Sequence, residues 1–173
     1  MTQDWFEQTT WNPEIESMFF AKLSKAREWN KSRYLRIQAA TLLFHGSPDY
    51  FPVALMLFNK VFNDYPDKEW DVMFSHSYLA DFYLEKGQYD DARKHYNILY
   101  EYNEKSIEKK DSDTCKMGIA EIIIKQKREN EYAFAQKLLE SMTHSFPQQF
   151  AFLLPIKKRW ESLVEQLKTL QQS

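Results

Sequence analysis

Apolar residues recur at intervals of three or four along most of the chain, which is the spacing of helices that bury one face. Asn12-Pro13-Glu14 predicts a helix start, because it combines a capping side chain, a proline suited to the first turn and a carboxylate near the positive end of the helix dipole. One face of this helix would carry Trp11, Ile15, Phe19, Leu23 and Ala26. A second helix is predicted from about Tyr34 to Phe44, ending before Gly46.

The apolar pattern also repeats at long range. One set of positions comprises Ala39, Leu42, Ala54, Phe58, Val61 and Pro66, and a second set, 81 residues later, comprises Ala120, Ile123, Ala135, Leu139, Met142 and Pro147. Between them lies a third window with nearly the same order, formed by Leu79, Ala80, Tyr83, Gly87, Tyr89, Ala92, Tyr96 and Leu99. Half of 81 is about 40, so the sequence predicts three units of roughly 40 residues each.

The residue types in these units suit pairs of packed helices. Small side chains at Ala80 and Ala92 would let two antiparallel helices approach closely, with Tyr83 and Tyr96 filling the space beside them. Gly87 is expected to end a helix in a left-handed turn. Pro66 and Pro147 are expected to stop the second helix of their units.

The segment from Leu79 to Ala92, LADFYLEKGQYDDA, resembles the tetratricopeptide repeat, including its Gly-x-Tyr and Ala-x-x-x-aromatic elements. The resemblance covers about 33 to 147 and is closest in the middle unit. Each outer unit carries about three extra residues, around Ser47-Pro48-Asp49 and around Arg128-Glu129-Asn130. The resemblance to this repeat implies an all-α, right-handed α-solenoid of about three hairpins, at about 33–66, 73–106 and 114–147. An N-terminal helix within 1–32 would pack on the array, and residues 148–173 would form a C-terminal capping helix.

The last segment carries a narrow apolar seam on one helix. Its members alternate at intervals of three and four and are Leu153, Ile156, Trp160, Leu163, Leu167 and Leu170. The seam can cover the end of the repeat stack, or it can join two copies of the chain, so both a monomer and a homodimer through 153–170 are open. Capping is favoured because the seam spans less than three heptads.

Composition supports helices and limits the kinds of partner. The 173 residues include 3 glycines and 6 prolines, too few for the frequent turns of a sheet protein, and 16% are aromatic. A formal net charge of −2 gives no global attraction to nucleic acid or to an anionic membrane, and neither is expected as a partner. The N-terminus lacks the pattern of a secretory signal and no apolar run would span a membrane, so a cytoplasmic location is expected.

Candidate chemistry is sparse, and the sequence predicts neither an enzyme nor a metal or cofactor site. His45, His76, His95 and His144 lack acidic or sulfur partners at ligand spacing, although His76 and His95 could approach each other. The single cysteine, Cys115, has no surrounding motif and is expected to be buried or incidental. The acidic pairs Asp90-Asp91 and Glu14/Glu16 fit first helical turns, and the run Lys157-Lys158-Arg159 is interpreted as a solvated face.

The resemblance implies a concave groove, lined by the first helix of each hairpin, that binds a protein or peptide segment. By alignment its lining would comprise Arg33, Arg36, Ala40, Leu43 and Phe44 from the first unit, Phe74, Ser77, Asp81, Leu84 and Glu85 from the second, and Thr114, Met117, Glu121, Ile124 and Lys125 from the third. Asp81 replaces the Asn of chaperone-binding members and would repel a peptide carboxylate, which argues against that subtype.

The sequence therefore predicts a non-catalytic interaction module. The N-terminal block, from Asp4-Trp5-Phe6 to Ala39, looks like that of small bacterial repeat proteins. An immunity protein that neutralises a toxin, or a secretion chaperone, would fit that resemblance. A self-associating scaffold built through the C-terminal helix is the alternative.

Overall fold

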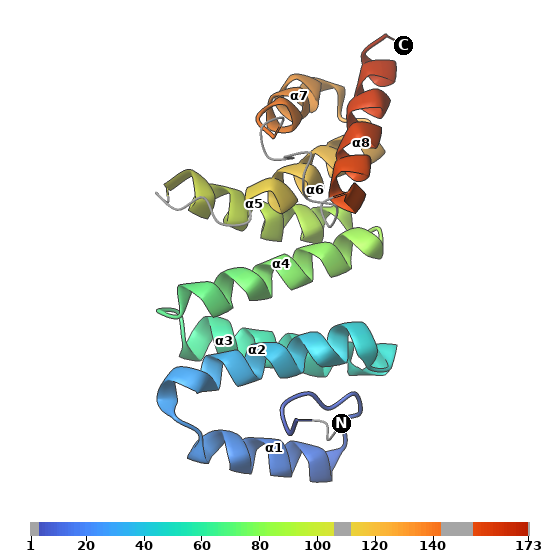
Figure 1. Ribbon diagram of the computed structural model, residues 1–173. Coiled ribbons are helices and arrows are strands. Elements are labelled where there is room, and N and C mark those ends of the chain that lie inside the picture. The colour runs from blue at the N-terminus through green and yellow to red at the C-terminus, as the bar shows by residue number, and fades with distance from the viewer. Residues whose placement is uncertain (1–3, 106–111, 143–153, 173) are drawn as a thin grey trace. The chain divides into compact units, whose positions relative to one another are not determined.

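The computed structural model describes residues 4–105, 112–142 and 154–172, and within these residues every regular element is a helix (Figure 1). The α-helices are α1 (Pro13–Lys25), α2 (Glu28–His45), α3 (Phe51–Asp64), α4 (Glu69–Glu85), α5 (Tyr89–Lys105), α6 (Ser112–Lys125), α7 (Tyr132–Glu140) and α8 (Leu154–Gln172). Two short 3-10 helices, η1 (Pro48–Tyr50) and η2 (Glu129–Glu131), precede α3 and α7. The all-α prediction is thus confirmed for the described residues.

The chain divides into two compact units, Met1–Tyr78 and Leu79–Ser173, and the boundary falls within α4. None of the helices in the described part of the chain is both long enough and apolar enough to cross a membrane.

Helix α1 begins as the sequence predicts. The Asn12 side chain accepts hydrogen bonds from the backbone N–H groups of Glu14 and Ile15, at 3.0 and 2.9 Å. These bonds satisfy donors that the first turn of a helix leaves unpaired. On the predicted apolar face, Phe19 and Leu23 are buried.

Helix α2 begins at Glu28, so the predicted start near Tyr34 was wrong. The early turns of α2 are polar in sequence, yet Ser32 is fully buried and donates a hydrogen bond to Asp71 of α4 at 2.6 Å. The contact with Asp71, which is distant in sequence, therefore stabilises the first turns of α2. The local pattern of apolar residues did not predict these turns. The predicted end is confirmed, since Gly46 caps the helix and donates to the Leu42 carbonyl.

An irregular N-terminal segment packs beside α1 and α2 in place of further helix. Its anchor is Gln38 on α2, whose fully buried side chain accepts from the backbone N–H of Gln8 at 2.9 Å and donates to the Gln8 carbonyl at 2.7 Å. Next to it, Phe6 stacks on Tyr34 with ring centroids 4.4 Å apart. The two hydrogen bonds to Gln38 satisfy the backbone N–H and carbonyl of Gln8, which have no helical partner.

The two predicted insertions form the 3-10 helices. Residues Pro48–Tyr50 form η1, between α2 and α3, and Glu129–Glu131 form η2, between α6 and α7. The helices that each insertion joins pack against each other, as the hairpin prediction expects. Helix α3 ends at Asp64, two residues before Pro66; Pro147 lies outside the described residues.

The middle helix pair turns at Gly87, which has the predicted left-handed backbone with φ +71°. Gln88 donates to the Tyr83 carbonyl at 2.8 Å, the longer hydrogen bond of a Schellman cap. Ala80, Ala92 and Tyr96 are fully buried, as close helix packing requires.

Helix α8 packs against α6 and α7 within the second unit. Leu163 and Leu167 of the predicted seam are buried, and the Trp160 indole donates to the Leu139 carbonyl at 2.9 Å. The middle of the seam therefore faces its own chain, whereas Ile156 near its start is 37% exposed. Leu153, at the start of the predicted seam, lies outside the described residues.

Candidate functional site

The predicted groove residues of the first compact unit, Met1–Tyr78, differ in exposure. Arg33 is exposed and Phe44 is 43% exposed, whereas Leu43 and Ser77 are buried. Arg36 and Phe74 are half-buried.

Four aromatic side chains of this unit form a continuous surface, here called the aromatic row: Phe44 from α2, and Trp70, Phe74 and Tyr78 from α4. The α4 members are four residues apart and so share one helix face. Their successive rings stack with centroids 5.7 and 6.3 Å apart, and Phe44 meets Tyr78 edge-on at 5.9 Å. Trp70 is 55% exposed, so the row combines large apolar area with access to solvent.

Arg36 of α2 contacts two members of the aromatic row and the neighbouring Asp71. Its guanidinium lies over the Phe74 ring at 5.1 Å, its Nε donates to Asp71 at 2.7 Å, and its Nη1 donates to the Tyr78 hydroxyl at 3.3 Å. Asp71 also accepts from Ser32. These contacts hold α2 and α4 together and limit the rotamers of the row, which lowers the entropy that a ligand would have to remove.

Sequence reasoning identified Arg36, Phe44 and Phe74 but missed Trp70 and Tyr78. The signal was present, since both lie four residues from Phe74. The alignment to the repeat directed attention to other positions of α4, of which Ser77 is buried.

Three predicted groove residues of the second compact unit, Asp81, Glu121 and Lys125, form polar contacts within that unit. Arg159 of α8 donates to Glu121 of α6 through Nε and Nη2, at 2.9 and 2.7 Å, and Lys125 contacts the same carboxylate at 2.8 Å. The Tyr96 hydroxyl donates to Asp81 at 2.5 Å. The interpretation of 157–159 as a solvated face was therefore wrong for Arg159, because the half-buried carboxylate of Glu121 on another helix binds it.

The remaining predicted residues of this unit are mixed in exposure. Leu84 and Met117 are buried, as is Ile124, while Glu85 and Lys125 are exposed.

Burial and charge act in opposite directions on the Glu121 carboxyl. Burial raises its pKa, but the hydrogen bond from Lys125 and the charge and hydrogen bond of Arg159 outweigh burial, so the pKa lies below its ordinary value. For Tyr96, burial and the adjacent Asp81 carboxylate both raise the pKa well above 10. Glu121 is thus held charged and Tyr96 neutral.

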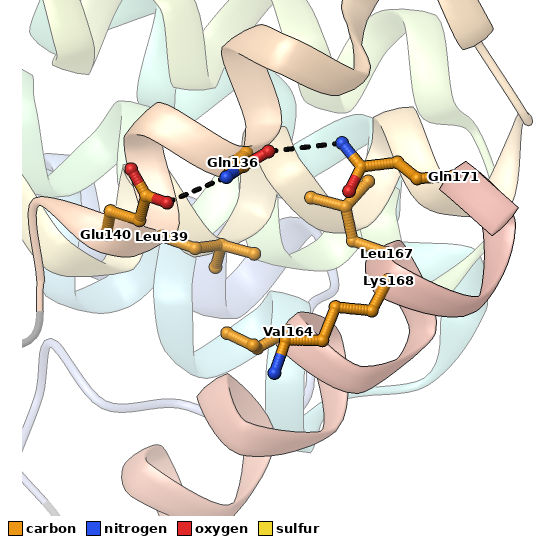
Figure 2. Close-up of a pocket in the computed structure, with 7 residues that line it drawn as sticks. All are labelled: Gln136, Leu139, Glu140, Val164, Leu167, Lys168 and Gln171. Carbon is orange, nitrogen blue, oxygen red and sulfur yellow. Dashed lines mark hydrogen bonds between the residues drawn. The ribbon is translucent and has the colours of Figure 1, made fainter.

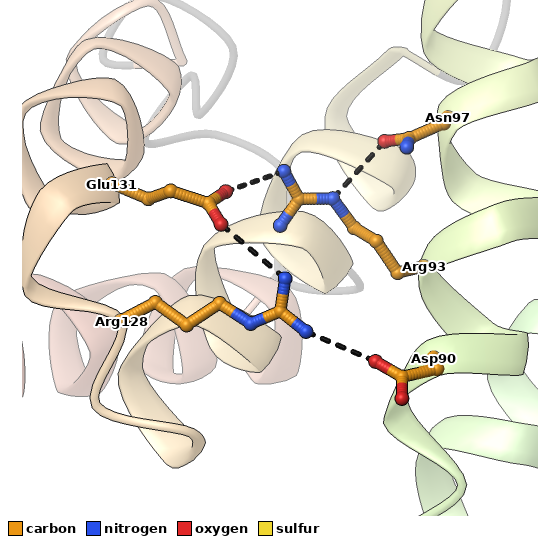
Figure 3. Close-up of polar contacts among 5 residues, drawn as sticks. All are labelled: Asp90, Arg93, Asn97, Arg128 and Glu131. Carbon is orange, nitrogen blue, oxygen red and sulfur yellow. Dashed lines mark hydrogen bonds and ion pairs between the residues drawn. The ribbon is translucent and has the colours of Figure 1, made fainter.

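A second polar cluster braces the insertion before α7 (Figure 3). Glu131 pairs with Arg93 at 2.7 Å and with Arg128 at 3.3 Å, and Arg128 also pairs with Asp90 at 3.0 Å. Arg93 further donates to Asn97. Since each charge faces an opposite charge, we interpret the cluster as a structural contact that joins α5 to η2 and the residue before it.

A shallow cleft of about 90 Å³ lies between α7 and α8 (Figure 2). Leu139, Val164 and Leu167 form its apolar wall, while Gln136 accepts from Gln171 and donates to Glu140. Its volume is well below the roughly 300–1,000 Å³ of small-molecule sites, so we interpret it as a gap between packed helices.

His76, His95 and Cys115 are packed among other side chains, whereas His45 is exposed. His76 stacks on Phe62 at 4.4 Å and His95 on Tyr83 at 5.7 Å, and burial lowers the pKa of His95. Cys115 is fully buried and accepts from Asn103. Across the described ranges, no group of three or more His, Cys, Asp or Glu side chains is placed to hold a metal ion. His144 lies outside those ranges.

Comparison with known proteins found no matching family model, no matching curated protein and no matching solved structure. The resemblance to tetratricopeptide repeats therefore stays a prediction from the sequence motif.

Proposed function

We propose that the chain is a non-catalytic interaction module that binds a protein or peptide segment through the aromatic row of its first unit. The observation that carries this proposal is the exposure of Trp70 and Phe44, 55% and 43%, on a surface braced by Arg36. Large exposed aromatic side chains held in place are the residues that contribute most to binding at protein interfaces.

A charged side chain on α2 can orient a ligand that binds the aromatic row. Arg33 is exposed on the same helix as Arg36 and Phe44. A ligand would place apolar side chains against the rings and hydrogen-bond acceptors near this arginine. In the second unit, by contrast, Glu121 and Asp81 already bind Arg159 and Tyr96, so that unit offers fewer free groups.

The proposal agrees with a solenoid of tetratricopeptide type. In that architecture the first helix of each hairpin lines the groove, and the aromatic row lies on α2 and α4, which are the first helices of the first two predicted units. The solenoid arrangement is part of the proposal.

The test is affinity capture from cells of the source organism with the wild-type chain and with a Phe44→Ala/Trp70→Ala variant. We expect a defined protein to bind the wild type in a reproducible ratio and to be lost from the variant, because truncating two aromatic anchors removes about 2 kcal/mol or more each. Ile156→Ala, which truncates an exposed apolar residue of α8, is the control and should retain the partner. Equal capture by the wild type and the double variant would contradict the proposal.

The alternative of a scaffold that self-associates through α8 has weaker support. Leu163 and Leu167, the central residues of the seam, are buried against the chain itself and would need to be released before they joined a second copy.

A further inference from the structure

A second candidate binding site lies in the first unit, where α1 is followed by α2. It is an open cleft of about 550 Å³. The side chains that line it belong to three parts of the chain, namely the N-terminal segment, the end of α1 and the start of α2: Trp5, Lys22, Lys25, Ala26, Arg27, Asn30 and Tyr34. None of these residues belongs to the aromatic row.

The cleft carries three positive charges with no paired carboxylate. Lys22, Lys25 and Arg27 are all exposed, and none of them forms an ion pair in the part of the chain that the structure describes. Two of them lie over aromatic rings: Lys22 is 6.0 Å from the Trp5 ring and Arg27 is 5.2 Å from the Trp29 ring. This local excess of positive charge stands against a net charge of −2 for the whole chain.

Trp5, an aromatic residue that lines the cleft, is held in position by its neighbours. Trp5 packs on Phe19 at 5.4 Å and on Tyr34 at 5.0 Å. The segment that carries Trp5 is anchored three residues later by the two hydrogen bonds between Gln8 and the buried Gln38. A ligand therefore meets a preformed apolar surface and would not have to order it.

The start of α2 adds to the positive potential. Arg27 occupies the N-cap position without a side-chain hydrogen bond to the first turn. The first N–H groups of an 18-residue helix thus lie next to the cationic side chains, and the helix dipole favours a negative group there.

We infer that this cleft binds an acidic peptide segment of a partner protein, with its carboxylates against Lys22, Lys25 and Arg27 and an apolar side chain against Trp5. A site for extended nucleic acid would need more cations than these three, because each neutralised phosphate of a continuous backbone calls for its own positive charge. The inference goes beyond the aromatic row, because it assigns a separate surface and a charge to what binds there.

The test is calorimetric titration of the full chain with a short, end-blocked peptide of alternating Glu and Ser around one Phe. We expect binding at low salt that weakens as salt rises, and no binding of the matched peptide in which Gln replaces Glu. A Lys22→Gln/Lys25→Gln variant should bind the acidic peptide about tenfold more weakly, which is the usual effect of removing two exposed ion pairs.

The matched control is Lys137→Gln/Lys158→Gln, which removes two exposed lysines of the second unit and should leave the affinity unchanged. The Phe44→Ala/Trp70→Ala variant should also bind the peptide normally, so failure of this inference is separable from failure of the proposed function. Equal binding by the wild type and the Lys22/Lys25 variant would overturn the inference. Tighter binding of a single-stranded oligonucleotide than of the acidic peptide would overturn it too.

Discussion

At the scale of single residues, Gly87 and Lys127 hold the same backbone conformation, 40 positions apart. Lys127 has φ 49°, and the next residue, Arg128, donates to the Ile123 carbonyl as Gln88 does to Tyr83. Both helices therefore end in the same cap, although only one uses the residue that adopts this conformation without strain.

The two caps predict opposite effects of substitution. Gly87→Ala should lower the free energy of unfolding by about 1 kcal/mol, because a Cβ is strained at positive φ. Lys127→Gly should raise it by up to about 1 kcal/mol through relief of the same strain. Urea denaturation of both variants checks the pair, and a loss of stability in Lys127→Gly would show that other contacts of Lys127 dominate.

The ring of Tyr96 on α5 lies directly against Gly118 on α6. A Cβ built on Gly118 would overlap the Tyr96 ring, so this glycine is required for close approach. Gly118→Ala should therefore cost about 2 kcal/mol or more of unfolding free energy. Adding the same change to a Tyr96→Leu background should cost less, and additive losses in the double variant would contradict this explanation.

The Tyr96 hydroxyl predicts a dependence on alkaline pH. Because burial and Asp81 raise its pKa in the folded chain, the unfolded chain loses this proton first as pH rises past about 10. The free energy of unfolding should then fall with rising pH. Tyr96→Phe should be about 1 to 2 kcal/mol less stable near neutrality and should show a shallower alkaline fall in urea titrations. An unchanged alkaline slope would contradict the assignment.

Residue types predicted these features unevenly. The turn at Gly87 was predictable, because glycine is favoured at positive φ. The positive φ of Lys127 was not predictable from its residue type. Asn12 likewise predicted its helix start through its own side chain. The exposed positions of the aromatic row depend on which face of α4 is covered by α2, and that is a tertiary property.

At the scale of elements, α8 is held by the charged contact between Arg159 and Glu121, by two hydrogen bonds to α7 and by apolar packing. Arg159→Gln should destabilise the docking of α8 by about 2 kcal/mol, since Glu121 would lose two charge-assisted hydrogen bonds. Hydrogen exchange of the α8 amides should then be faster. Lys158→Gln, an equal loss of charge at the exposed neighbouring position, is the control. Equal exchange rates in both variants would contradict the role of Arg159.

The same contact predicts a response to acid. The pKa of Glu121 is lowered in the folded chain, so its contribution to stability is complete above the ordinary value near 4.5 and is lost as pH falls below it. Amide exchange in α8, corrected for the intrinsic effect of pH, should rise over that range in the wild type. In Arg159→Gln the rise should be smaller.

Elements with strong local signals were predicted well, and elements defined by distant partners were not. The extra residues around 47–49 and 128–130 were detected as breaks in the repeat, and they overlap η1 at 48–50 and η2 at 129–131. The first turns of α2 and the irregular segment at Gln8 escaped prediction, because a buried serine and a buried glutamine stabilise them through residues 39 and 30 positions away.

At the scale of the whole molecule, burial of the α8 seam predicts a monomer. Analytical ultracentrifugation should give one mass, close to 20.9 kDa, at all protein concentrations up to the highest attainable. Leu163 and Leu167 would otherwise have to leave the second unit at a cost of about 1.5 to 3 kcal/mol each. A dimer that Leu163→Glu dissociates into folded monomers would contradict this prediction and favour the scaffold alternative.

The five tryptophans are divided unequally between the two compact units. Four of them, Trp5, Trp11, Trp29 and Trp70, lie in Met1–Tyr78, and Trp160 alone lies in Leu79–Ser173. Because the Trp160 indole is bonded to a carbonyl of α7, its emission spectrum depends on whether α8 is docked. The difference in intrinsic fluorescence between the wild type and Trp160→Phe therefore isolates one optical signal for the second unit, and the remaining emission follows the first unit without any added label.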